Sequence, residues 1–217
     1  MKKLDIDGTV IPRKTTLGEL IANAVSHGIG FLLAIAGLIL LVIKADTTIE
    51  TVSSVIFGVS MVLLYLSSTL LHSFPDSMKT VQNIFRRFDH SSIFILIAGT
   101  YTPFLLLLVG TTEAYVLLVG LWIITVIGII YKSIWVEKYM GVSLIIYLLM
   151  GWSFVIVSND IISGLGNDIV FLVIGGVLYT VGVLFFIMKF KYSHFIWHIF
   201  VLGGTLFHFI CVYEYLL

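Results

Sequence analysis

Histidines at helical spacing are the part of this sequence best suited to chemistry. His194 and His198 are four residues apart, so on a helix they share a face and can hold one ion together. His72 adds a third imidazole from a distant part of the chain. Three imidazoles with one open position form the common catalytic zinc arrangement, in which bound water ionises near neutral pH. We therefore predict a zinc site at His72, His194 and His198, although histidines near helix ends can also lie at a membrane interface without a metal.

Two further side chains are candidates for catalysis beside this metal. Ser68 precedes His72 by four residues and lies on the same helix face, where it can position water or substrate. Asp89 can accept a proton from water at the zinc, or orient a ligand imidazole. Both residues also have a structural interpretation, Ser68 as a serine that bonds to the backbone or packs between helices, and Asp89 as a helix N-cap. The residues alone leave these alternatives open.

Four more polar residues are expected near the same layer. Glu19, Asn23 and His27 share one helix face at positions i, i+4 and i+8, and either line the cavity or form an interhelical hydrogen bond. Glu19 also completes the sequence T-L-G-E, which is typical of a capping box at a helix start. His90 is one residue, or about 100° of helix, from Asp89, so both cannot easily point at one ion. His90 is therefore the weaker candidate ligand.

The elements that must position these residues are long and apolar. Hydrophobic residues make up 59% of the 217 residues and charged residues only 11%, against roughly 25% in a soluble domain. This composition excludes a soluble enzyme, a disordered chain and a nucleic-acid binder. A membrane-spanning helix needs about 20 apolar residues. Seven segments without Asp, Glu, Lys or Arg meet that need: 20–43, 51–75, 90–112, 114–131, 139–159, 169–188 and 192–213.

We therefore predict an all-α integral membrane protein, a seven-transmembrane helix bundle that forms one domain over residues 1–217. Residues 1–18 would be a short cytoplasmic segment, residues 159–168 a polar external turn, and Pro103 a kink in the third span. Of the 12 basic residues, 11 fall on one side, which places the N-terminus in the cytoplasm and the C-terminus outside. Only Lys44 falls outside. The inside residues are Lys2, Lys3, Arg13, Lys14, Lys79, Arg86, Arg87, Lys132, Lys138, Lys189 and Lys191.

This orientation brings His72, Asp89, His194 and His198 into one layer near the cytoplasmic face. His208 is ten residues beyond His198, or about 15 Å further along the helix, so it cannot join the same site. We expect it to serve in packing or proton relay. Ionisable groups within a membrane span are unfavourable and usually functional, so the shared layer is the strongest functional signal in the sequence.

Five motifs give the chain a recognisable pattern. They are E-L-I-A-N-A-V-S-H-G at 19–28, S-S-T-L-L-H-S-F at 67–74, F-R-R-F-D-H-S-S-I at 85–93, G-T-Y-T-P-F at 99–104 and S-H-F-I-W-H-I-F at 193–200. With them the chain resembles the bacterial haemolysin III family, which is related to the progestin and adipoQ receptors and more distantly to alkaline ceramidases. The resemblance implies zinc held by His72, His194 and His198, with Ser68 and Asp89 beside it.

Two classes of function follow. The first is a zinc-dependent hydrolase of a lipid amide or ester in the bacterial plasma membrane, with membrane lipids as both bilayer and substrate. The second is a non-enzymatic membrane protein with structural zinc, either a pore-forming cytolysin or a receptor or sensor of membrane lipid state. A secreted toxin is disfavoured because no cleavable signal is expected before the first span. Receptor signalling is disfavoured because the segment before that span is short. The oligomeric state stays open.

Overall fold

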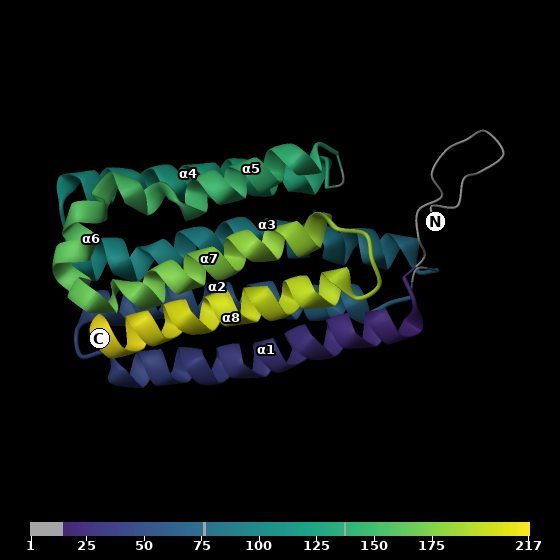
Figure 1. The fold of residues 1–217 in the computed structure, drawn as a ribbon, viewed down its shortest axis with the longest axis horizontal. Coiled ribbons are helices and arrows are strands. Elements are labelled where there is room, and N and C mark those ends of the chain that lie inside the picture. Colours follow the sequence, from purple (N-terminus) through teal and green to yellow (C-terminus); the bar gives the residue numbers. More distant parts are fainter. Residues whose placement is uncertain (1–14, 76, 137) are drawn as a thin grey trace.

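The chain forms a bundle of helices, which Figure 1 shows from the side with its longest axis horizontal. The computed structural model describes residues 15–75, 77–136 and 138–217 and contains no strand in these ranges. Lys2, Lys3, Arg13 and Lys14, which contribute to the expected orientation, lie outside the described residues. The α-helices are α1 (Leu17–Lys44), α2 (Thr48–Ser73), α3 (Lys79–Pro103), α4 (Thr112–Ile134), α5 (Met140–Gly151), α6 (Ser158–Leu165), α7 (Ile169–Ile187) and α8 (Ser193–Tyr215).

Six helical stretches in the described ranges are long and apolar enough to cross a membrane. Five are single helices or, for Lys79–Val109, α3 with the π-helix η1 (Phe104–Val109) that follows Pro103. The sixth stretch, Met140–Ile187, contains α5, α6 and α7. Figure 1 shows that the chain reverses direction around α6, so α5 and α7 run in opposite directions.

The outer surface of the bundle is apolar. Val116 and Ile127 of α4 and Leu149 of α5 are each at least 60% exposed. An apolar surface of this extent marks contact with a membrane rather than with water. Many polar side chains within the helices, such as Asn23, Ser68 and Thr125, are buried instead, as expected for helices that face lipid on one side and each other on the other.

Two predicted boundaries are wrong. The third span was expected to begin at His90, but α3 begins at Lys79 with Met78 as its N-cap. The charged turns between Lys79 and His90 are therefore part of the helix. Asp89 is therefore not a helix cap. The segment 159–168 was expected to be a turn, but most of it is the helix α6, whose Ile161 and Leu165 pack into the core.

Glu19 fastens the start of α1 to the start of α8. Its Oε2 accepts hydrogen bonds from the Thr16 backbone N–H at 2.9 Å and the Thr16 hydroxyl at 2.8 Å, which completes the predicted capping box. Its Oε1 accepts a hydrogen bond from the Tyr192 backbone N–H at 2.8 Å. Tyr192 has a left-handed backbone conformation with φ of 64°, which is unfavourable for a tyrosine. Glu19 thus stabilises the strained residue that leads into His194.

The double role of Glu19 can be measured. Glu19→Ala should lower the free energy of unfolding by about 1–3 kcal/mol, because it removes a cap and leaves the part-buried Tyr192 backbone N–H without this partner. Glu50→Ala is the matched control, since Glu50 completes an equivalent capping box with Thr47 at an exposed site without a link to another helix. Thermal unfolding in detergent should show a larger drop in Tm for Glu19→Ala, and equal drops would contradict this role.

Candidate metal centre

The three predicted histidine ligands meet at one end of the bundle. His72 is the second-last residue of α2, and His194 and His198 lie in the first two turns of α8. Each offers one ring nitrogen, and these three atoms lie within 4.8 Å of one another. The ring centroids are 5.0 Å apart for His72 and His194, 5.1 Å for His72 and His198, and 4.7 Å for His194 and His198. The triad could hold a metal ion.

Helix α1 orients the His198 ring. His198 Nδ1 lies 3.2 Å from the Asn23 carbonyl oxygen and 3.1 Å from the Ser26 hydroxyl oxygen. The Ser26 hydroxyl donates to the same carbonyl oxygen at 3.0 Å, so its proton is already engaged and its oxygen can accept. We assign the proton of His198 to Nδ1 on this basis, which leaves Nε2 free to bind a metal. Such outer hydrogen bonds fix both the tautomer and the direction of a ligand imidazole.

The other donors also fit a metal ion. His72 Nε2 is buried without a hydrogen-bond partner among the described residues. A buried ring nitrogen in this state is unfavourable unless something else binds it. Three neutral imidazoles suit zinc, copper, iron or nickel, and three histidines with an open position are the usual donor set of catalytic zinc.

Ser68 and Asp89 lie together beside the triad. Both line the same cavity, and the Ser68 hydroxyl interacts with the Asp89 carboxyl group. Ser68 is only 2% exposed, and the Asp89 side chain is 14% exposed. Asp89 lies three turns into α3, as the start of that helix at Lys79 requires. The arrangement gives a carboxyl group with a hydroxyl neighbour in the wall of a cavity next to three imidazoles.

His90 is not one of the three clustered histidines. Its Nδ1 is 3.4 Å from the Val136 carbonyl oxygen, and its Nε2 is 3.8 Å from Asp89 Oδ2. Its backbone carbonyl accepts a hydrogen bond from the Tyr147 hydroxyl at 2.8 Å. His90 therefore links Asp89 to the connection between α4 and α5.

The three polar residues of α1 have different surroundings. Glu19 is engaged by Thr16 and Tyr192, as described above. Asn23 uses its backbone carbonyl to hold His198, while its side-chain Oδ1 is buried without a partner in the described ranges. His27 lines the cavity and stacks on His198, with ring centroids 3.5 Å apart. Of these three residues, only His27 belongs to the cavity wall.

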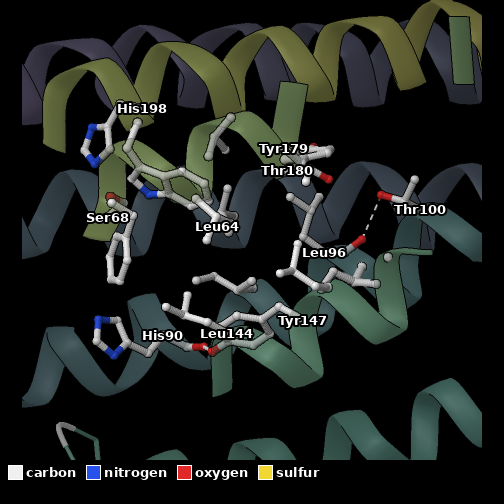
Figure 2. A pocket seen from close by; sticks show the side chains of 18 of the residues that line it. Leu64, Ser68, His90, Leu96, Thr100, Leu144, Tyr147, Tyr179, Thr180 and His198 are labelled. Carbon is white, nitrogen blue, oxygen red and sulfur yellow. Dashed lines mark hydrogen bonds between the residues drawn. The ribbon is translucent and has the colours of Figure 1, made fainter. Parts of the chain in front are cut away.

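The cavity extends from the triad into the middle of the bundle (Figure 2). It contains about 1160 Å³ of space not filled by atoms, part of which is open to the outside. One end holds His194, His198 and Asp89, and the wall continues through apolar side chains such as Leu64, Leu96 and Leu144. The other end reaches His208, which is about 15 Å along α8 from His198. The length and apolar lining suit a hydrocarbon chain.

His208 does not join the triad. Its Nε2 lies 3.1 Å from the Leu172 carbonyl oxygen on α7. A side chain at Gly175 would come within 2.3 Å of the His208 ring, so glycine at this position lets α7 and α8 approach around the histidine. His208 therefore packs between α7 and α8, which is one of the two roles expected for it, while the proton-relay role stays a prediction.

Ser26 is the site residue that sequence reasoning missed. Its hydroxyl, together with a backbone carbonyl, sets the direction of His198. A serine within an apolar segment carries no signal of this role, because most such serines bond to their own helix. Only its position three residues after Asn23 and beside His27, on the face that meets α8, could have suggested it.

The fold and the triad together define a multi-pass membrane protein with a candidate metal site inside the helical bundle. Residues 17–209 match the Haemolysin-III related family, and the chain belongs to it. It is 46% identical to a protein named Hemolysin-3 homolog from Bacillus subtilis (strain 168), over 92% of this chain and 95% of the relative. It is 43% identical to Hemolysin-3 from Bacillus cereus, over 92% of each. A human protein named Monocyte to macrophage differentiation factor is 32% identical, over 94% of this chain and 87% of the relative.

The metal site predicts a clear dependence on the triad. Purified protein should contain a transition metal, and His72→Ala or His198→Ala should abolish its retention, because two imidazoles bind far more weakly than three. Ser26→Ala should weaken metal binding by about tenfold, as loss of an outer hydrogen bond usually does. Metal content by elemental analysis and affinity by chelator competition test both.

His208→Ala is the matched control for these variants, since it removes a buried histidine that lines the same cavity outside the triad. It should keep the metal. Full metal occupancy in both His72→Ala and His198→Ala would rule the site out.

Proposed function

We propose that the protein is a zinc-dependent hydrolase that cleaves an amide or ester bond of a membrane lipid. The observation that carries this proposal is the position of the three clustered imidazoles at one end of a long apolar cavity, with Asp89 and Ser68 in the wall beside them. The apolar part of a lipid fits the cavity, and its carbonyl group then lies at the polar end. Zinc bound to the triad would act as a Lewis acid and lower the pKa of water.

The chain's own residues supply the proton transfers. Asp89 accepts a proton as water attacks the carbonyl carbon of the lipid. The bond between that carbon and the leaving nitrogen or oxygen then breaks, and Asp89 returns the proton to the leaving group. The products are a carboxylic acid and an amine or alcohol. The Ser68 hydroxyl, which interacts with the Asp89 carboxyl group, holds that group in position.

The same proposal includes the topology of seven spans with the N-terminus in the cytoplasm of a bacterial cell. Support comes from the 11 basic residues assigned to one side and from the reversal of the chain around α6. The start of α1 and the connection between α7 and α8 lie at the same end of the bundle in Figure 1. The triad lies at that end, so it would face the cytoplasm.

Cysteine labelling tests this topology. Asp46→Cys, between α1 and α2, should react with a membrane-impermeant maleimide added to intact spheroplasts, whereas Lys189→Cys, between α7 and α8, should react only after permeabilisation. The native Cys211 is fully buried, so the unmodified protein is the control for background labelling. Labelling of both variants, or of Lys189→Cys alone, in intact spheroplasts would contradict the orientation.

Loss of the Asp89 carboxylate tests the hydrolase directly. Asp89→Asn should lower hydrolysis by about a hundredfold or more while leaving metal content unchanged, because an amide cannot accept the proton. Release of fatty acid from a panel of ceramides and phospholipids in detergent micelles measures the reaction. Asp168→Asn is the matched control, since Asp168 lies at the opposite end of the bundle, at the start of α7, and should leave the rate unchanged.

A second candidate function is membrane lysis, which the name of the Bacillus cereus relative suggests. The same protein preparations separate the two candidates. Dye release from liposomes that is equal for the unmodified protein and His72→Ala, with no lipid hydrolysed by either, would favour lysis over hydrolysis.

A further inference from the structure

His27 is a buried histidine whose ring nitrogens are not satisfied by the side chains and backbone described around it. The side chain is 3% exposed and lines the cavity. Neither of its ring nitrogens has a hydrogen-bond partner in the part of the chain that the structure describes. The backbone of His198 is a polar neighbour, but outside normal hydrogen-bond geometry. A neutral imidazole carries one N–H donor and one acceptor, and leaving both unpaired inside a bundle is unfavourable. The ring can therefore form a hydrogen bond with a ligand in the cavity.

The stacking of His27 on His198 argues against a role as another metal ligand. The two ring planes are nearly parallel, at 9°, with centroids 3.5 Å apart. An imidazole binds a metal through a lone pair in the plane of its ring. Because the two rings lie in nearly parallel planes, one above the other, the lone pairs of His27 lie parallel to the His198 ring plane. They therefore do not point at the metal position that His198 faces. The cluster of ligand atoms accordingly consists of His72, His194 and His198.

The position of His27 suits a hydrogen bond to whatever the triad binds. The ring is held from two sides, by the stack on His198 and by an edge contact with Tyr65 at 5.1 Å and 81°. The backbone carbonyl of Asn23, one turn earlier on α1, contacts His198 Nδ1 and so fixes the ring on which His27 stacks. A donor fixed in this way requires no rearrangement when charge develops near it, which is the condition for strong electrostatic stabilisation.

We propose that His27 is a catalytic residue that donates its N–H to the carbonyl oxygen of the lipid substrate. This inference rests on the proposed hydrolase function and names the chemical group that α1 recognises. As water attacks the carbonyl carbon, negative charge develops on the carbonyl oxygen, and the His27 N–H stabilises it. The proton of water goes to Asp89 and then to the leaving nitrogen or oxygen, while His27 keeps its own proton throughout.

A hydroxamate titration tests this role without requiring turnover. The full-length protein is loaded with Co²⁺, and a long-chain alkyl hydroxamate, whose oxygens bind metals, is titrated while the visible absorption of cobalt is recorded. His27→Phe keeps an aromatic ring for the stack but removes the donor. It should retain Co²⁺ and bind the hydroxamate at least about tenfold more weakly, the loss expected for one hydrogen bond to a charged oxygen.

Tyr131→Phe is the control, since it also removes one hydrogen-bond donor from an aromatic side chain but lies outside the cavity, and it should leave hydroxamate affinity unchanged. If His27→Phe does not fold, His27→Gln and His27→Ala replace it, and His27→Gln, which keeps a side-chain N–H donor, should bind the hydroxamate more tightly than His27→Ala. Unchanged hydroxamate affinity in His27→Phe, or equal affinity in His27→Gln and His27→Ala, would overturn the proposal. Loss of Co²⁺ from His27→Phe would also overturn it, because His27 would then serve only to support His198.

The outcome is separable from that of the proposed function. If the unmodified protein binds Co²⁺ and hydroxamate but hydrolyses no lipid, the hydrolase is overturned and with it the substrate named for His27. If it hydrolyses lipid and His27→Phe does so at the same rate with unchanged hydroxamate affinity, only the role of His27 is overturned.

Discussion

The contact between α1 and the His198 imidazole organises the polar end of the bundle. His198 Nδ1 faces the Asn23 carbonyl and the Ser26 hydroxyl, so the opposite nitrogen is directed at His72 and His194. One turn earlier, Glu19 holds the backbone of Tyr192 just before α8. Helix α1 thus supports α8 at two successive levels. In a bundle surrounded by lipid, hydrophobic association contributes little between helices, so such polar contacts and close packing must fix their register.

The distribution of unpaired polar atoms separates this end of the molecule from the rest. Deeper in the bundle, the Tyr65 and Tyr179 hydroxyls each lie 2.7 Å from the Thr205 hydroxyl, and Trp152 donates to Thr180 at 3.0 Å. Among the described residues, six buried side-chain atoms lack a partner, and four of them belong to Asn23, His27 and His72. Polar groups elsewhere in the bundle largely satisfy one another, whereas those around the triad are left available. The unpaired atoms and the histidine spacing therefore both indicate a ligand site around His72, His194 and His198.

The sequence alone predicts the identity of the site better than its geometry. The i, i+4 spacing of His194 and His198 and the shared depth of His72 depend only on helical periodicity, which apolar spans reveal directly. The direction of His198 depends on a backbone carbonyl and on Ser26, and neither carries a sequence signal. The start of α3 differs from the prediction because Arg86, Arg87 and Asp89 are charged yet helical, and a charge-free segment begins only after them, at His90. The helix α6 was missed because its polar and glycine residues resemble a turn, while its burial depends on Ile161 and Leu165.

The break after α5 shows how the fold makes room for a ligand. At Gly151 the α-helix ends and the chain continues as the 3-10 helix η2 (Ser153–Val157). The Tyr101 hydroxyl donates to the Gly151 carbonyl at 2.7 Å and accepts from the Phe154 backbone N–H at 2.9 Å, so it satisfies one carbonyl and one N–H at the break. Irregular backbone at membrane depth is tolerated where it is buried in protein or lines a cavity. Gly151 and Trp152 line this one, so the break in α5 and the polar end near α1 belong to a single cavity whose apolar length separates them.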